Sequence, residues 1–180
     1  QFALYHNRYN LPCETPVKST AYSGWKELEK ALIKQHDIAF IVPVYMYDHG
    51  SLSFHVGYNR PYPFNDRWDS GMVGFAFVTK SMVKNVFGWQ RVSDKRKQWL
   101  LDYMRAEMET YQYYANGQVY GYTIDSDDAD SSCGGCYGYD SARLEAHSYI
   151  DYIIKMNVIT LEKEIHTCVE VSNEEFFNGR

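Results

Sequence analysis

The longest unbroken run of apolar and aromatic residues is IAFIVPVYMYD, from Ile38 to Asp48. Its even positions from Ile38 to Met46 are all apolar, while its odd positions end in Pro43, Tyr45 and Tyr47. An extended strand here would therefore bury aliphatic side chains on one face and carry aromatic rings on the other. Because Pro43 cannot donate a ladder hydrogen bond, we expect this strand to lie near an edge of its sheet or to carry a bulge.

Shorter patterns on either side of this run predict the other elements. The turn Asp48-His49-Gly50 and the alternating residues that follow it predict a β-hairpin. The further predicted strands are residues 52–56, 72–78, 118–125, 131–139 and 158–171. Capping residues precede four helical patterns. The predicted helices begin at Ser23, at Thr79, at Ser93 or Asp94, and at Asp140 or Ser141.

Together these elements predict a single α+β domain over residues 1–180, in which a mostly antiparallel sheet carries about four helices packed on one face. Residues 1–20 are expected to form an irregular N-terminal segment, because Pro12 and Pro16 interrupt any regular pattern. Residues 172–180 are expected to form a frayed tail.

Composition excludes several classes of protein. A formal net charge of -5 argues against direct sequence-specific DNA binding, because phosphate neutralisation requires clustered Lys and Arg. The sequence has no apolar run near the roughly 18 residues that a membrane span requires, so no membrane association is expected. Four scattered cysteines are too few for a disulfide scaffold and indicate a reducing compartment. We therefore expect a cytoplasmic protein.

Tyrosine is unusually abundant, with 17 residues in a chain of 180. A tyrosine ring buries apolar area while its hydroxyl stays polar, so an excess beyond the needs of the core favours exposed rings that bind a partner. Gly74 and Gly121 lie in predicted strands close to several tyrosines and would let a second backbone or a planar ligand come near. The predicted binding residues are Tyr45, Tyr47, Arg60, Tyr62, Trp68, Tyr120 and Tyr122. The alternative is that these rings pack under the helices.

An alternative reading of the same region is catalytic. Asp48 and His49 in the predicted turn, with His55 across the hairpin, would place a carboxylate beside two imidazoles. Asp69 is the fourth residue of this alternative catalytic set. Such a group serves general acid–base chemistry or holds a metal. Isolated histidines are more often ordinary surface residues. The leading interpretation assigns no catalytic residue, and these four residues are the candidates of the alternative, catalytic interpretation.

The Cys133-Gly134-Gly135-Cys136 segment is the sharpest local motif. Two thiolates separated by two glycines can reach one tetrahedral zinc ion, although a structural site requires two further ligands. Candidates for those ligands are Cys13, Cys168, His147 and His166. The alternatives are a redox-active pair and a reduced glycine turn without metal. The leading interpretation therefore assigns no cofactor and keeps zinc as the alternative.

Other familiar chemistry is excluded. The acidic residues Asp125, Asp127, Asp128 and Asp130 fail the calcium-loop spacing, because Cys136 stands where that loop needs a bidentate glutamate. The sequence contains no GxGxxG, no P-loop and no GxSxG. Phosphate-cradling loops and nucleophile elbows are therefore not expected.

Four blocks of the sequence form one ordered pattern: PVYMYDHG (43–50), WDSGMVGFAFVTK (68–80), EMETYQYYANGQVYGY (107–122) and DSSCGGCYGYD (130–140). This pattern resembles a functionally uncharacterised family of small bacteriophage and mobile-element proteins. The chain departs from the family pattern in its longer NRPYPFND loop and in its second cysteine, Cys136. The resemblance implies no catalytic residue; it implies a phage accessory protein that acts on its bacterial host.

Taken together, these observations predict a non-enzymatic protein that binds and inhibits a host macromolecule. The expected partner is a host protein of a nucleic-acid-targeting defence system, so the activity would be of anti-CRISPR or anti-restriction type. An acidic, tyrosine-rich surface can cover a basic nucleic-acid channel. The alternatives are a small metal-dependent hydrolase or nucleotide-acting enzyme, and a protein that captures a nucleotide signal by stacking.

Overall fold

The computed structural model describes residues 1–58, 62–125 and 131–157. Its helices and antiparallel sheets confirm the predicted α+β class. The sequence predicts one domain over residues 1–180, whereas the chain forms two compact units, Gln1–Asn116 and Gly117–Arg180. Each unit is described by itself below. No described helix combines the length and the apolar character needed to cross a membrane.

The first unit contains a four-stranded antiparallel sheet in the order β1-β4-β2-β3. The strands are β1 (Phe2–Leu4), β2 (Ile38–Asp48), β3 (Leu52–Val56) and β4 (Ser70–Thr79). β2 has the predicted bounds and forms the predicted hairpin with β3. It lies next to the edge strand β3, so it is near an edge as expected but does not itself form the edge. The alternative expectation, a bulge, is confirmed by a register shift between Val44 and Tyr45.

Pro43 is tolerated inside the sheet because of where its nitrogen faces. Its carbonyl oxygen accepts a hydrogen bond from the Gly57 N–H at 2.9 Å, just beyond the end of β3. The nitrogen and carbonyl of one strand residue point to the same side. The missing donor therefore faces the end of β3, and the ladder between β2 and β4 is preserved.

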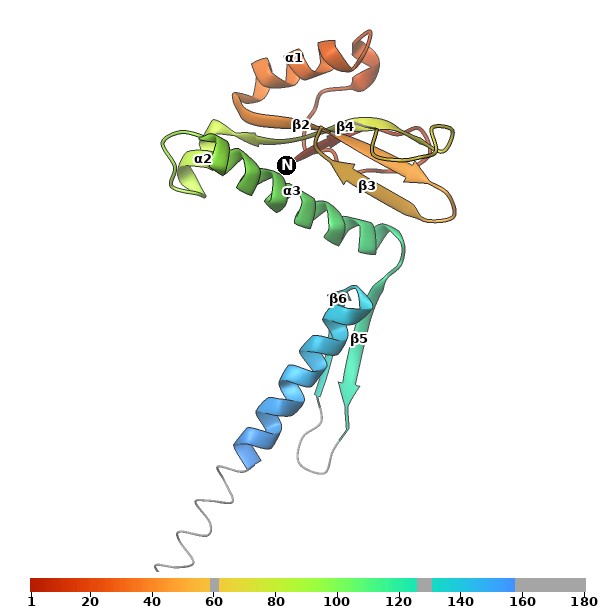
Figure 1. The fold of residues 1–180 in the computed structure, drawn as a ribbon, viewed down its shortest axis with the longest axis vertical. Helices are drawn as coiled ribbons and strands as arrows, with labels where there is room; N and C mark the ends of the chain where they lie inside the picture. The colour runs from red at the N-terminus through yellow and green to blue at the C-terminus, as the bar shows by residue number, and fades with distance from the viewer. Residues whose placement is uncertain (59–61, 126–130, 158–180) are drawn as a thin grey trace, which may run out of the picture. The chain divides into compact units, whose positions relative to one another are not determined.

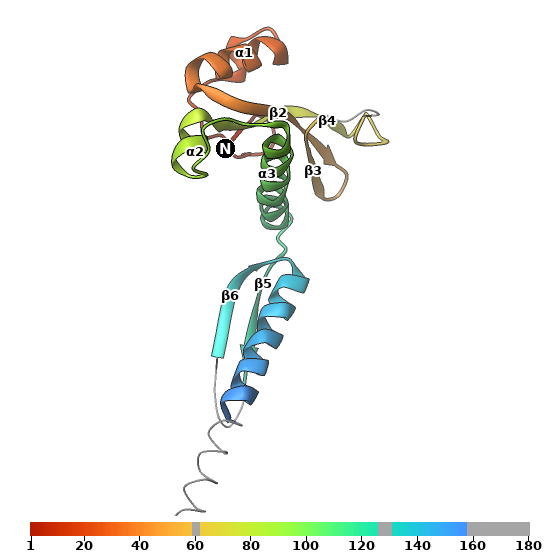
Figure 2. The ribbon, with the colours of Figure 1, turned by 60° about the vertical axis from the view of Figure 1, so that its left-hand side comes forward.

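Helices cover both faces of this sheet (Figure 1, Figure 2). They are α1 (Trp25–His36), α2 (Lys80–Asn85) and α3 (Asp94–Ala115), with a short 3-10 helix η1 (Ser19–Ala21) before α1. Phe75 and Phe77 of β4 pack in one cluster with Leu28 and Leu32 of α1. The alternate β4 residues pack in a second cluster with α2 and α3. The expectation of helices on one face is wrong, because β4 is apolar on both of its faces.

The N-terminal segment contains a strand that the sequence pattern missed. β1 pairs with β4, and its Ala3 and Leu4 are buried. A strand of three residues is too short to show alternation, and the nearby prolines obscured it. Gly74 of β4 explains how β1 fits: a Cβ built on Gly74 would lie 2.1 Å from the carbonyl oxygen of Ala3. Glycine therefore permits the close approach of a second backbone, as its position in the predicted strand suggested.

Two of the predicted helix caps are confirmed. The Thr79 hydroxyl accepts a hydrogen bond from the Met82 N–H at 3.2 Å, and the Ser93 hydroxyl accepts one from the Arg96 N–H at 3.4 Å. The cap of α1 is Gly24, not the predicted Ser23.

The second unit contains a hairpin of β5 (Val119–Ile124) and β6 (Ser131–Tyr137), followed by helical residues 139–157. Figures 1 and 2 show this helix lying along the hairpin. Both elements were predicted, but the two strands form a sheet of their own. The predicted strand 158–171 and the predicted tail 172–180 lie outside the described residues.

Substitution of Gly74 by alanine should destabilise the first unit by about 3 kcal/mol, because the new methyl group collides with the β1 backbone and Gly74 has a φ of +151°. Gly71 is the matched control in the same strand, since nothing lies within 4 Å of its would-be Cβ. Urea denaturation measures both variants. A Gly74→Ala variant as stable as Gly71→Ala would contradict the position given to β1.

Candidate functional site

The β2–β3 turn and the segment that leads into β4 meet at one end of the four-stranded sheet. The Asp48 N–H donates a hydrogen bond to the Asp69 carbonyl oxygen at 2.8 Å, and Tyr47 pairs with Ser70 across the ladder. We call this region the Trp68 surface. It consists of Tyr45, Tyr47, Asp48, His49, Tyr62, Phe64, Asp66, Arg67, Trp68 and Asp69.

The base of the Trp68 surface is a cluster of aromatic rings. Tyr47 stacks on Phe64 with ring centroids 5.5 Å apart and on His49 at 5.9 Å. Tyr45 meets the ring of Tyr62 edge-on at 5.5 Å. The two β2 tyrosines are thus half-buried under the loop. They form a rigid support, so the expectation that they are themselves open to a partner is only partly met.

Trp68 is the most exposed ring of this region, with 98% of its surface accessible. Its backbone is nevertheless fixed, because the Trp68 N–H donates to the Asp66 carboxylate at 2.7 Å. Ser70 Oγ donates to the Asp66 carbonyl oxygen and contacts the Tyr62 hydroxyl at 3.2 Å. The Arg67 guanidinium lies 5.3 Å from the centre of the Tyr62 ring. The loop therefore holds an indole in solvent on a well-supported backbone.

Two polar pairs lie beside the indole. His49 Nδ1 lies 2.9 Å from Asp69 Oδ2, and this hydrogen bond and the carboxylate charge raise the pKa of His49 above its ordinary value of 6.5. The Asp48 carboxylate accepts a hydrogen bond from the Tyr9 hydroxyl at 2.7 Å, which raises the pKa of that hydroxyl. Arg8 also pairs with Asp48 at 3.4 Å.

Three of the four alternative catalytic residues come together here, and His55 does not. The hairpin register pairs Asp48 with Leu52 and places His55 opposite Tyr45, three residue pairs away. Burial lowers the pKa of His55, and the charge of Arg105 lowers it further. The predicted group of two imidazoles and a carboxylate therefore does not form, because the turn is too tight to bring position 55 beside position 48.

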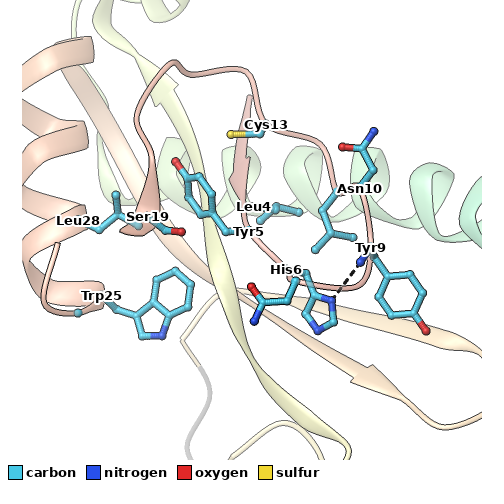
Figure 3. A pocket seen from close by; sticks show the side chains of 12 residues that line it. Leu4, Tyr5, His6, Tyr9, Asn10, Cys13, Ser19, Trp25 and Leu28 are labelled. Carbon is cyan, nitrogen blue, oxygen red and sulfur yellow. Dashed lines mark hydrogen bonds between the residues drawn. The ribbon is translucent and has the colours of Figure 1, made fainter. Parts of the chain in front are cut away.

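Two hollows adjoin the Trp68 surface, and His6 lines both. The smaller, of about 350 Å³, lies among Asp48, Trp68 and Asp69. The larger, of about 560 Å³, lies between the N-terminal segment and the start of α1 (Figure 3). His6 Nδ1 accepts a hydrogen bond from the Tyr9 N–H at 3.3 Å, which Figure 3 draws as a dashed line. The hollows make this part of the surface concave, so the side chains of a partner can fit into them.

Two polar side chains of the larger hollow, Tyr5 and Cys13, have hydrogen-bond partners. The Tyr5 hydroxyl donates to the Val17 carbonyl oxygen at 2.8 Å, and burial together with Cys13 raises the pKa of Tyr5. Cys13 Sγ contacts the Thr15 carbonyl oxygen at 3.6 Å.

The remaining predicted binding residues lie elsewhere. Tyr120 and Tyr122 belong to the separate hairpin of the second unit, where Tyr120 is 38% exposed and packs edge-on against Tyr139. Arg60 lies outside the described residues. The stacking of a nucleotide signal on the sheet tyrosines stays a prediction.

The carboxylate of Glu145 lies beside the two cysteines of the Cys133–Cys136 motif. Ligand atoms of Cys133, Cys136 and Glu145 all lie within 4.8 Å of one another. Of the ligands predicted to complete this group, Cys13 belongs to the first unit and His147 is not part of the group. His166 and Cys168 lie outside the described residues.

Sequence reasoning missed the residues that reach the Trp68 surface from the N-terminal segment. Arg8 and Tyr9 contact Asp48 from about 40 positions away, and no local pattern signals a contact at that separation. Phe64 had a signal, since it is one of several aromatic residues in a proline-containing loop.

Comparisons with known proteins find nothing similar: no protein-family model, no curated protein and no solved structure matches this chain. The resemblance to phage proteins therefore stays a prediction.

The Asp69→Asn variant should lower the pKa of His49 toward 6.5, because it removes the carboxylate that favours the imidazolium. The contribution of the wild-type pair to stability is fully present below pH 6.5 and is lost as the pH rises through the raised pKa. An NMR titration of the His49 ring measures both proteins. An unchanged titration midpoint in the variant would contradict the hydrogen bond.

Proposed function

We propose that this chain is a binding protein that docks on a partner through the Trp68 surface. One observation carries the proposal: Trp68 is 98% exposed while the Asp66 carboxylate holds its backbone N–H and the Tyr47 and Phe64 rings of the same surface stack on each other. Tryptophan is enriched among the residues that dominate binding energy at protein interfaces.

Magnitudes favour this interpretation of Trp68. Burying an indole removes roughly 150–250 Å² from water, which is worth about 4–6 kcal/mol at 25 cal/mol per Å². The exposed indole contributes none of this to the fold. Because hydrogen bonds from Asp66 and Ser70 already hold the backbone around Trp68, little conformational entropy of that backbone would be lost on binding. Much of the free energy of burying the indole would therefore contribute to the affinity for the partner.

The charges around the indole and on the whole chain bear on the chemistry of the partner. Asp48, Asp66 and Asp69 lie around the indole, with Arg8 paired to the first and His49 to the last. The whole chain carries a formal charge of -5. Arg67 also belongs to this surface, so the local charges are nearly balanced. The preference for a basic partner therefore rests on the acidic charge of the whole chain, since complementary charge accelerates and orients docking.

The partner that best fits this chemistry is a host protein with a basic nucleic-acid channel. This partner chemistry and the resemblance to phage and mobile-element proteins together support an inhibitor of a nucleic-acid-targeting defence system, of anti-CRISPR or anti-restriction type. The inhibitor would act in the cytoplasm of a bacterial host. Such an inhibitor would cover the channel and exclude nucleic acid from it.

A second candidate is an acid–base enzyme, which the 2.9 Å contact between His49 and Asp69 favours. In that reading Asp69 orients the imidazole and leaves Nε2 free to move a proton. Two observations weigh against it. His49 is 69% exposed, so the pair works in bulk water, and Ser70 Oγ is held by Asp66 and Tyr62 rather than by His49.

Trp68→Ala should weaken the partner complex by about 2 kcal/mol or more, roughly 30-fold in Kd, because the variant removes the anchor. Its unfolding free energy should change by less than about 0.5 kcal/mol, because the side chain is exposed. Affinity capture from a bacterial host lysate with the tagged chain identifies the partner, and calorimetry then gives the Kd of each variant.

Tyr114→Ala is the matched control, since Tyr114 is an exposed ring on α3, 64% accessible and outside the Trp68 surface. It should bind as the wild type does. Equal affinities of the Trp68→Ala and Tyr114→Ala variants for the captured partner would refute docking through Trp68.

Asp69→Asn separates docking from catalysis, because it keeps the shape of the surface and removes the carboxylate that orients His49. Docking predicts that any loss of inhibition follows a matching loss of partner affinity, because Asp69 is also one of the charges of the Trp68 surface. An acid–base enzyme predicts a loss of at least about 100-fold in rate. Loss of inhibition with partner binding retained would replace the docking proposal with the enzyme.

A further inference from the structure

A β-bulge in the second unit places both cysteines of the CGGC motif on one face of the hairpin. In a regular strand, residues three positions apart point to opposite faces. Here Cys136 pairs with Tyr120 and Cys133 pairs with Tyr122, two residues that share a face of β5. The register shift at Gly121 accommodates the extra residue, and Gly135 takes the left-handed conformation with a φ of +80°. The two glycines thus direct both thiols to the same side.

The helix of residues 139–157 brings a carboxylate to the same two thiols. Cys136 Sγ lies 3.5 Å from Glu145 Oε2, and the ligand atoms of Cys133, Cys136 and Glu145 all lie within 4.8 Å of one another. In a tetrahedral zinc site, bond lengths of 2.3 Å to sulfur and about 2.1 Å to oxygen separate a sulfur from an oxygen by about 3.6 Å and two sulfurs by about 3.8 Å. The distance between Cys136 Sγ and Glu145 Oε2 therefore already matches a zinc site. Cys133 is exposed, and its Sγ needs to move by only about 1 Å or less to match as well.

We propose that Cys133, Cys136 and Glu145 bind a zinc ion. Two thiolates and one carboxylate are a donor set that zinc accepts, and sulfur ligands disfavour magnesium and calcium. The ion would link β6 to the helix that follows it. Three protein ligands leave one tetrahedral position for water or for a fourth ligand.

The second unit has a physical need for such a link. Among its described residues, Cys136 and Ala142 are the buried apolar side chains, while Leu144, Tyr152 and Ile154 are more than half exposed. Small units with little apolar burial commonly depend on a disulfide or a metal for stability. A zinc ion that binds the folded hairpin and helix would supply folding free energy directly.

Proton release gives a specific signature of thiolate ligands. A free cysteine thiol has an ordinary pKa of about 8.5 and is mostly protonated at neutral pH. A divalent cation reverses that balance, because zinc binds the thiolate and displaces the proton. Binding should therefore release protons, and its affinity should increase as the pH rises.

The test uses the whole chain, reduced and freed of metal, titrated with Co²⁺ and then with Zn²⁺. We expect one equivalent of Co²⁺ to give the charge-transfer and ligand-field bands of a tetrahedral thiolate centre. We expect Zn²⁺ to displace it. Calorimetry in buffers of different ionisation enthalpy counts the protons released.

Variants identify the ligands. Glu145→Gln should weaken zinc binding by more than the roughly 10–100-fold that outer-sphere partners cost, and Cys133→Ser and Cys136→Ser should abolish the thiolate bands. His147→Gln, on the same helix, and Cys13→Ser, in the first unit, are the controls and should bind as the wild type does. Glu145 is exposed, so its variant tests the site without disturbing the core.

The bulge provides an independent test. Gly135→Ala should weaken zinc binding about tenfold, because alanine disfavours the left-handed conformation that aligns the thiols. Gly134→Ala is the matched control, since Gly134 has neither a positive φ nor a close neighbour. The proposal fails if the reduced wild-type chain binds neither ion at micromolar concentration. It also fails if Cys13→Ser or His147→Gln loses the metal while Glu145→Gln keeps it.

Discussion

Burial of both faces of the β2–β4 pair is the constraint on which the first unit depends. Phe77 and Val78, adjacent in β4, point to opposite faces and are 0% and 1% exposed. A strand that is apolar on both faces must be covered on both sides, and α1 covers one side while α2 and α3 cover the other. Tyr45 and Tyr47 lie beyond the α1 cluster, so a loop rather than a helix covers them. That loop carries Trp68.

Local patterns in the sequence predicted the elements well, and their assembly less well. β2, both hairpins and α3 were predicted because each carries its own periodicity, turn or cap. The three residues of β1 carry no pattern, so their contact with Gly74 could not be predicted. Which strands share a sheet is set by contacts distant in sequence, and the separate β5–β6 sheet was missed for this reason.

The same distinction applies to the two sites. Asp48 and His49 are neighbours in a turn that the sequence predicts, and Asp69 was named with them as an alternative catalytic residue, whereas Arg8 and Tyr9 arrive from a distant segment. The spacing of Cys133 and Cys136 was visible in the sequence, but a regular strand would have turned the thiols apart. The bulge at Gly135 and the approach of Glu145 required coordinates. Both sites therefore combine a local motif with a residue supplied by the tertiary fold.

The central claim is that Trp68 is covered when the protein meets its partner. Radical footprinting of the free chain and of the purified complex, read residue by residue by mass spectrometry, tests it most directly. We expect strong protection of Trp68 in the complex, while the exposed ring of Tyr114 is modified equally in both samples. Equal modification of Trp68 in the free and bound chain would contradict the account.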